Sequence, residues 1–412
     1  MRARLRPYAS RVEPDIRGIR WTFALVGVAD GTLLPFIPVY LFQRGLDAAG
    51  VGAVLAGMAV VWLFAGLIWG YLADHRFRAE RIVLLGICAT AALSLSLALP
   101  GQASVLGMLI VVLTVARSPL TLLDAIALRK LRSMSRTGYA RIRLRMSAGW
   151  AVSAVASGAL YHEFGMRLIP FMYAPLTAFV AIWVWRAVKP DTAAVYVETV
   201  NPVGRSVRLG GIPAAMVGFL VACLLLGISL AATQNFVTLQ IDFLGGGALL
   251  IGAAAAFQAL TEIPTMGYTH VLTRHLSHRA LFAIGCAIYL AVFVAWAVIS
   301  SALVVALLKL VIGVGFALTY VASVTIANEL SPARLRATGQ ALVKSVMFGL
   351  APIVGALGGG VVYGSLGARF MFLASTLVVA AAGALALVVV PVMRRQVEPA
   401  VATVEAAAPA TP

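Results

Sequence analysis

Residues 161–174 read YHEFGMRLIPFMYA, and residues 363–376 read YGSLGARFMFLAST. The two stretches share a Tyr, a Gly and an Arg at the same offsets, about 200 residues apart. A second pair, GYLADHRFRAERIVLLG (70–86) and GYTHVLTRHLSHRALFAIG (267–285), supplies a short basic loop at the same place in each half. The paired signatures indicate that the chain consists of two repeated halves.

The composition places both halves in a lipid bilayer. Of the 412 residues, 61% are hydrophobic and 11% are charged, whereas a soluble domain holds about 45–50% apolar and about 25% charged residues. The run from 281 to 324 contains Lys309 as its only charge and is too long for one span, so we place a turn at Ser300–Ser301. A spanning helix needs about 20 apolar residues, and twelve segments qualify: 20–42, 50–73, 82–100, 104–127, 143–164, 168–188, 212–234, 247–272, 280–299, 301–326, 340–363 and 368–392.

The basic residues alternate from loop to loop. The amino-terminal segment, the even-numbered loops and the carboxyl-terminal segment carry nearly all of the Lys and Arg, whereas the opposite loops hold Arg44, Arg167 and Arg369. The positive-inside rule therefore predicts that both termini are cytoplasmic. The net charge of +17 reflects this topology and an attraction to anionic headgroups, and it does not indicate a nucleic-acid partner.

These patterns predict an all-α membrane protein with twelve transmembrane helices in two six-helix, pseudo-symmetric bundles. We expect a monomer in the inner cell membrane. The expected divisions are a cytoplasmic amino-terminal segment (1–19), a first bundle (20–188), a cytoplasmic linker (189–211), a second bundle (212–393) and a disordered cytoplasmic tail (394–412).

Several short stretches carry a family resemblance. Gly70-Tyr-Leu-Ala-Asp74 is similar to the G-x-x-x-D-R-x-G-R-R signature between helices 2 and 3 of the major facilitator superfamily, although His75 and Phe77 depart from it. Within that superfamily, the chain resembles the branch that holds the lactose permease, the nucleoside symporters and the phenylpropionate permease. The stretches concerned are PFIPVYLFQRGLDAAGVGAVLAG (35–57), LDAIAL (123–128), YARIRLRMSAGW (139–150), TEIP (261–264) and GQALVKSVMFGLAPIVGALGGG (339–360).

The resemblance implies roles for particular residues. Asp124, Arg143 and Trp150 match the carboxylate of helix 4 and the Arg and Trp of helix 5 that bind sugar in the lactose permease, and Glu262 matches its carboxylate on helix 8. The His–Glu proton relay of helix 10 is absent, because Ile312 and Gly315 stand at those positions. The signature assigns its loop to a gate between helices 2 and 11, with Gly70, Asp74 and Arg78 as the gating residues.

Ionisable residues inside the predicted spans form a second set of candidates. An unpaired charge at the centre of a membrane helix costs about 2.5–3.5 kcal/mol on insertion scales, so these side chains are expected to face one another or water. Arg117 and Asp124 lie seven residues apart on one helical face, about 10.5 Å along the axis, and should therefore pair with other helices. The set consists of Asp30, Arg117, Asp124, Glu262, Lys309 and Lys344.

Structural explanations remain open for most of these residues. Asp124 could serve only to neutralise Arg143, and Glu262 could pair with a Lys without touching a solute. Lys309 and Lys344 could extend to the membrane surface, and Trp150 could be a packing residue. Two polar residues, Gln234 and Asn235, end the predicted helix 7, where they would either bind a polar solute or contact solvent.

The sequence favours transport over catalysis. It contains no phosphate-binding Walker loop, no nucleophile elbow and no Cys/His cluster for a metal, and the three Cys fall in apolar runs, so we expect no enzyme activity and no cofactor. The mixed acids and bases favour a proton-coupled symporter of a small polar solute such as a sugar, nucleoside or aromatic acid. Asp30, Asp124 or Glu262 would carry the proton. The alternative is a proton-driven efflux antiporter for drugs or metabolites.

Overall fold

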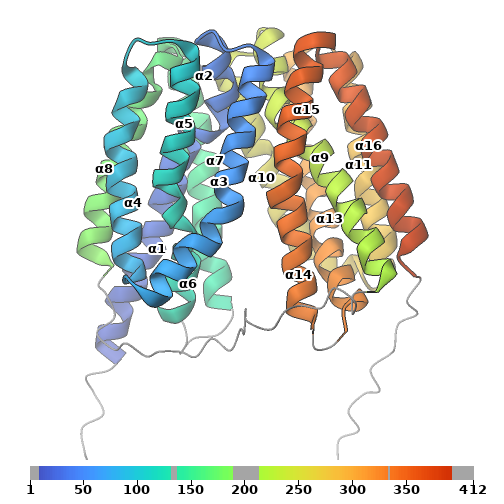
Figure 1. Cartoon of the computed structure of the whole chain (residues 1–412), viewed down its shortest axis with the longest axis horizontal. Helices are drawn as coiled ribbons and strands as arrows, with labels where there is room; N and C mark the ends of the chain where they lie inside the picture. The colour runs from blue at the N-terminus through green and yellow to red at the C-terminus, as the bar shows by residue number, and fades with distance from the viewer. Residues whose placement is uncertain (1–8, 131–136, 189–212, 333–334, 392–412) are drawn as a thin grey trace, which may run out of the picture.

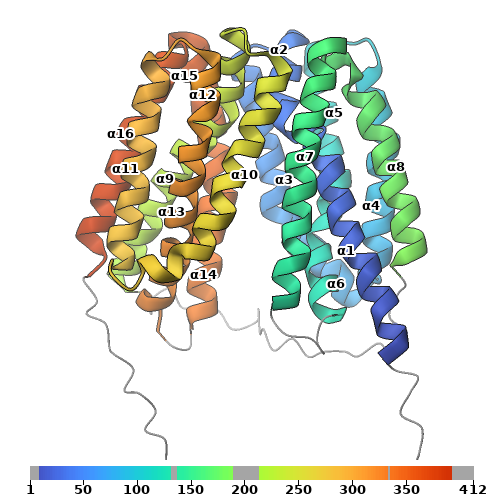
Figure 2. The ribbon, with the colours of Figure 1, turned by 180° about the vertical axis from the view of Figure 1, so that it is seen from behind.

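The computed structural model describes residues 9–130, 137–188, 213–332 and 335–391. All secondary structure in these residues is helical, and the helices form two bundles that stand side by side (Figures 1 and 2). The predicted all-α fold class is confirmed. The predicted linker (189–211) and tail (394–412) lie outside the described residues, and helix α1 begins at Ala9, inside the segment predicted as 1–19.

The first half contains six spans. Two of them are interrupted by short 3₁₀ segments that contain a Pro, and the third span ends in a 3₁₀ segment. The elements are α1 (Ala9–Gly31), η1 (Leu34–Phe36), α2 (Ile37–Gln43), α3 (Ala48–His75), α4 (Ala79–Ser94), η2 (Leu95–Ala98), α5 (Ala103–Arg117), η3 (Ser118–Thr121), α6 (Leu122–Lys130), α7 (Thr137–Phe164), η4 (Met166–Leu168) and α8 (Ile169–Ala187).

The second half repeats this arrangement, with a π-helix in its fifth span. Its elements are α9 (Ala214–Phe243), α10 (Gly247–Leu272), α11 (His278–Val298), α12 (Ala302–Leu307), α13 (Lys309–Leu330), α14 (Arg336–Ser345), the π-helix η7 (Val346–Leu350), α15 (Ala351–Leu366) and α16 (Ala368–Val389). The turn expected at Ser300–Ser301 is confirmed, because α11 ends at Val298 and α12 begins at Ala302.

Eleven helical segments of the described chain are long and apolar enough to cross a membrane. The twelfth, α7, does not meet this criterion; it carries Arg143 and Arg145 in its first half and His162 and Glu163 in its last turn. It nevertheless packs along α1 on one side and α10 on the other, which places it inside the helical assembly.

The predicted end of the seventh span at residue 234 is wrong. Helix α9 continues to Phe243, so Gln234 and Asn235 lie in the interior of a helix. Two polar side chains lower the hydropathy of the stretch without breaking the helix, since its backbone hydrogen bonds stay within the helix. The polar groups then need partners elsewhere in the protein.

The helix is not continuous between Arg117 and Asp124, for which the spacing in the sequence predicts one helical face. The 3₁₀ segment η3 lies between them and contains Pro119, which has no backbone N–H to donate. The change from α-helix to 3₁₀-helix alters the rotation per residue, so the spacing of seven residues alone does not fix their relative direction. Each residue pairs with another helix, as expected.

Close contacts between the halves lie toward one end of the bundles. A Cβ on Gly52 of α3 would come within 2.4 Å of the Ala356 carbonyl oxygen of α15, and one on Gly252 of α10 would come within 2.1 Å of the Ala154 carbonyl oxygen of α7. We call this the junction end; it holds the turns at Gly45 and Gly245, both with positive φ.

The other end, where α1 begins and α16 ends, is the terminal end (Figure 1). There α6 packs against α1, α3 and α4, and α14 packs against α9 and α13, each within its own half. The two halves therefore meet at the junction end and diverge toward the terminal end (Figures 1 and 2).

Candidate substrate and coupling site

A buried ion pair joins the first and fourth spans of the first half. Arg117 ends α5, and its Nε donates to Asp30 Oδ1 at 3.0 Å while its Nη2 lies 2.6 Å from Asp30 Oδ2. The side chains are 7% and 6% exposed, so both charges are removed from water and satisfied by each other. The guanidinium carbon also lies 5.4 Å from the centre of the Trp62 ring, and the buried Tyr173 side chain interacts with the same guanidinium.

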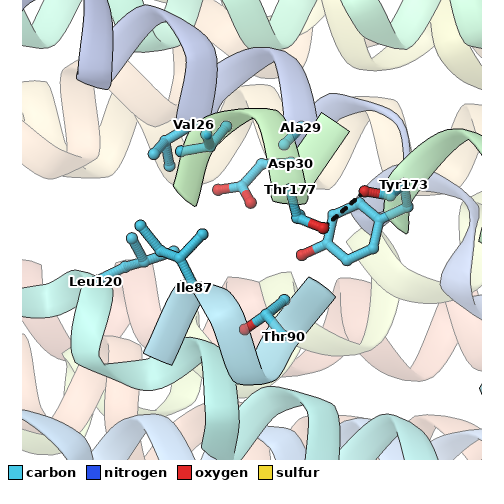
Figure 3. Close-up of a pocket in the computed structure, with 9 residues that line it drawn as sticks. Val26, Ala29, Asp30, Ile87, Thr90, Leu120, Tyr173 and Thr177 are labelled. Carbon is cyan, nitrogen blue, oxygen red and sulfur yellow. Dashed lines mark hydrogen bonds between the residues drawn. The ribbon is translucent and has the colours of Figure 1, made fainter. Parts of the chain in front are cut away.

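A small cavity lies on the side of this pair that faces α4 and α8. Figure 3 shows Asp30 at its edge, with Thr90 and the Tyr173 ring opposite and Thr177 donating to the Tyr173 carbonyl oxygen at 2.9 Å. The Thr90 hydroxyl donates to Gly86 of its own helix at 2.8 Å, which leaves its oxygen free to accept. The remaining lining is apolar: Val26, Ala29, Ile87, Leu120 and Val180.

The second half holds a polar cluster built on Lys309. Its Nζ donates to Oε1 of Gln234, and Lys309 is only 6% exposed. Glu262 on α10 is half-buried, interacts with Gln258 one turn away and is electrostatically coupled to Lys309. No carboxylate within the described chain lies within ion-pair distance of Lys309, so its charge is held by a neutral amide with an acid nearby.

The polar residue next to Gln234 has a different role. Asn235 Nδ2 donates to the Ala231 carbonyl oxygen, 2.8 Å away on its own helix. Its side chain is thus folded back onto α9, whereas Gln234 reaches across to the fourth span of the half.

The two halves use the same pairing of spans with different chemistry. In each half a base on the fourth span bonds to a side chain on the first span, Arg117 to Asp30 and Lys309 to Gln234. A residue on the second span completes each group, Trp62 in the first half and Glu262 in the second. In the first group the base is paired with a carboxylate, that of Asp30. In the second group the base bonds to an amide, and the carboxylate of Glu262 has no ion pair among the described residues.

Asp124 and Arg143 form a third pair, which joins α6 to α7. Arg143 Nη1 donates to both carboxylate oxygens, at 3.1 and 3.2 Å. The side chains are 42% and 53% exposed, so this pair is in contact with solvent. Trp150 lies two turns further along α7 and is half-buried.

The six ionisable residues expected to face one another or water do so in different ways. Asp30 and Arg117 pair within the set, but Asp124 takes its partner from α7 and Lys309 bonds to an amide. Lys344 is exposed on the last turn of α14, without an ion pair among the described residues, as expected for a Lys that reaches solvent.

The predicted gating residues lie at the terminal end. Asp74 and Arg78 are exposed, and a Cβ on Gly70 would meet no atom within 4 Å, so this loop is not packed against the other half. Helix α3 contacts the other half through α15 and η7, where Gly349 lies against Leu63. The gating role itself stays a prediction.

Sequence reasoning missed two acid–base contacts at repeat-related helix ends, an Arg–Glu ion pair and a His–Glu hydrogen bond. Arg129 at the end of the fourth span binds buried Glu80 at the start of the third, and His278 Nδ1 lies 2.7 Å from Glu329 Oε1 at the same place in the second half. The acid and the base have exchanged helices between the halves. Their sequence signal is the repeated loop quoted above, in which Glu80 and His278 each precede an Arg.

Comparison with known proteins identifies this architecture. The family described as MFS_1 like matches residues 22–374. The chain belongs to the MFS_1 like family. It is therefore a multi-pass membrane transporter of the major facilitator superfamily and not an enzyme.

One curated relative resembles this transporter over most of its length. Maltose permease of Geobacillus stearothermophilus is 27% identical over 335 residues, which cover 80% of this chain and 82% of that protein.

Solved structures share the fold of this transporter at low sequence identity. The nucleoside transporter NupG has a TM-score of 0.79 and 16% identity, with 91% of this chain and 98% of that chain covered. A bacterial homologue of the human lysosomal transporter Spinster, in an inward-facing and occupied conformation, has a TM-score of 0.68 and 14% identity, with 93% and 97% covered.

Proposed function

We propose that this transporter carries out proton-coupled symport of a small hydroxylated solute, with a sugar as the leading substrate class. The observation that carries the proposal is the cluster of Gln234, Glu262 and Lys309, where a buried base bonds to a neutral amide and the nearby acid has no ion pair among the described residues. The name of the maltose permease relative supports a sugar. The name of the NupG structure makes nucleosides the second class to test.

The cluster offers the groups that a hydroxylated solute needs. The amide of Gln234 can donate and accept, the carboxylate of Glu262 can accept, and the ammonium of Lys309 can donate three hydrogen bonds. Each solute hydroxyl can do both, so it can insert between an acid and a base without leaving either unsatisfied. An apolar solute would leave these groups unpaired, which disfavours its binding.

We assign the transported proton to Glu262. Asp30 would have to leave both of its bonds to Arg117 before it could bind a proton, whereas Glu262 has no ion pair to break among the residues that the structure describes. A protonated Glu262 can donate to a solute oxygen; after the proton leaves, its carboxylate attracts the ammonium of Lys309 instead. Solute and Lys309 thus compete for one group, which links release of the proton to release of the solute.

We assign the terminal end to the cytoplasm and the described state to an inward-facing conformation. The basic loops support the first assignment, and the contact of the halves at the junction end supports the second. An impermeant thiol reagent added outside intact cells should label a Cys at position 102 and spare one at position 200. Labelling at position 200 but not at position 102 would show that the terminal end faces outward and would overturn this assignment.

Uptake into proteoliposomes tests the function. Purified protein is reconstituted with an inward proton gradient and offered labelled maltose, uridine and an aromatic acid, with and without a protonophore. We expect accumulation of maltose that the protonophore abolishes. Extrusion of a preloaded solute against its gradient, without uptake of any of the three, would instead establish the antiporter.

A further inference from the structure

Three aromatic side chains gather on the second half beside the polar cluster. Phe316 and Tyr320 of α13 are stacked, with ring centres 5.8 Å apart and an angle of 9° between their planes. Phe348 of the π-helix η7 stands across both, 6.3 Å from Phe316 at 63° and 5.9 Å from Tyr320 at 59°. Together the rings form two walls of an apolar corner, which we call the aromatic corner (Phe316, Tyr320 and Phe348).

The corner lies on the same face of α13 as the polar cluster. Lys309, Gly313, Phe316 and Tyr320 follow one another at intervals of four, three and four residues, which aligns them along one side of a helix. Phe316 is therefore about 10 Å from Lys309 toward the terminal end. Between them, a Cβ on Gly313 would lie 2.3 Å from the Gln258 carbonyl oxygen of α10, on the helix that carries Glu262.

The π-helix sets the direction of Phe348. Its neighbours in the chain are both engaged, since Gly349 lies against Leu63 of the opposite half and Met347 lies against Gly227 of α9. Phe348 lies between these two contacts and remains 42% exposed. A π-turn interrupts the regular helical register and often occurs at functional sites. Here it accompanies a large exposed ring on the side of the half that carries the polar cluster.

Tyr320 adds a polar group to the corner. Among the described residues its hydroxyl has no hydrogen-bond partner, although the residue is half-buried. A Tyr hydroxyl that is enclosed normally finds a partner. Its position at the edge of the corner suits a hydrogen bond to a bound molecule.

We propose that the aromatic corner holds the ring of the transported solute, and that the ring is a pyranose. This inference rests on the proposed function. A pyranose has faces made of C–H groups and a rim of hydroxyls, so a face can lie on an aromatic ring while the rim reaches polar groups. The stacked rings take the face, Phe348 closes the side, and the hydroxyls of the rim face Tyr320 on one side and Glu262, beside Gly313, on the other. The corner thereby selects cyclic solutes over open-chain polyols of the same polarity.

Binding to purified protein tests the proposal independently of transport. Maltose and uridine are titrated calorimetrically into the wild type and into Phe316→Leu, Phe348→Leu, Phe348→Tyr and Tyr320→Phe. We expect each Leu variant to bind maltose about 3- to 10-fold more weakly, because stacking on a ring contributes beyond its buried area. Phe348→Tyr keeps the ring and should bind maltose as tightly as the wild type. Phe179→Leu serves as the matched control, since Phe179 is an exposed aromatic residue of α8 in the other half.

The outcomes separate the two proposals. Unchanged maltose affinity in both Leu variants overturns the aromatic corner and leaves the symport proposal standing. Binding of uridine in place of maltose, or of neither, overturns the pyranose as occupant. The expected loss of maltose binding, without gradient-driven accumulation in proteoliposomes, supports the corner and refutes proton-coupled symport.

Discussion

The guanidinium of Arg117 bonds to both carboxylate oxygens of Asp30, whereas the ammonium of Lys309 bonds to the amide of Gln234. In the first group the two buried charges neutralise each other, so loss of either side chain leaves the other without a counter-charge. The second holds an excess base next to Glu262, and its members can change partners. Stability and transport are therefore expected to respond differently to substitutions in the two halves.

The Asp30–Arg117 pair should behave as a structural unit. Asp30→Asn leaves the buried guanidinium without a counter-charge, and loss of one partner of a buried pair costs about 3–5 kcal/mol. The double variant Asp30→Asn with Arg117→Gln removes both charges and should recover much of the thermal stability. Melting of the purified variants in detergent measures this effect. A double variant that melts below Asp30→Asn would show that the two side chains do not act as a unit.

Substitution of Glu262 should separate coupling from exchange. Glu262→Gln keeps the size and hydrogen-bonding capacity of the side chain but cannot release a proton. We expect gradient-driven accumulation to be lost while exchange of internal for external solute continues. The assay is repeated with Asp30→Asn and Asp124→Asn, and with Glu163→Gln as an exposed control. If Glu262→Gln accumulated solute to the wild-type level, another acid would have to carry the transported proton.

The Asp124–Arg143 pair should contribute little to stability. Pairs open to solvent stabilise by about 0–1 kcal/mol, and these side chains are about half exposed. If Arg143 binds the solute, Arg143→Lys loses the planar fork of donors, and affinity should fall about tenfold or more with little change in melting temperature. Calorimetric titration of Arg143→Lys and Asp124→Asn distinguishes this role. Unchanged affinity in both variants would show that the pair does not bind the solute and serves only to hold α6 against α7.

Bulk at Gly252 should prevent the junction end from closing. Even a Cβ would come within 2.1 Å of the Ala154 carbonyl oxygen, and a backbone atom cannot move aside as a flexible side chain can. Gly252→Val should favour the state open at the junction end, so that an impermeant reagent added on that side reaches a Cys at position 235 faster. Gly66→Val is the matched control, because a Cβ there meets nothing within 4 Å. Equal labelling rates in the two variants would contradict this account.

Hydropathy predicted the spans well where apolar runs end in Gly, Ser or charged residues. The predicted segment 247–272 coincides with α10. The same reasoning ended the seventh span at Gln234, because a window of hydropathy cannot distinguish a polar residue in a transporter interior from one at a membrane surface.

The sequence was less informative about which side chains pair with one another across helices. Spacing along one helix cannot specify a partner 87 residues away, as in the Asp30–Arg117 pair. The resemblance to known transporters identified Asp124 with Arg143, because that pair lies on consecutive spans near a matched motif. It identified neither the bond of Lys309 to Gln234 nor the direction of Phe348, which depend on a helix break at Leu308 and on a π-turn.

The ion pairs of Asp30 with Arg117, Glu80 with Arg129 and Asp124 with Arg143 each lie within the first half of the chain, and the His278–Glu329 contact lies within the second. During synthesis, the first half can therefore satisfy Asp30, Glu80 and Asp124 before the ribosome has translated α9. The nascent bundle would then wait in the membrane with its buried charges already neutralised, and the second half would need only to dock through small residues such as Gly252 and Ala356. A chain cut in the linker and expressed as two polypeptides should therefore reassemble into an active transporter.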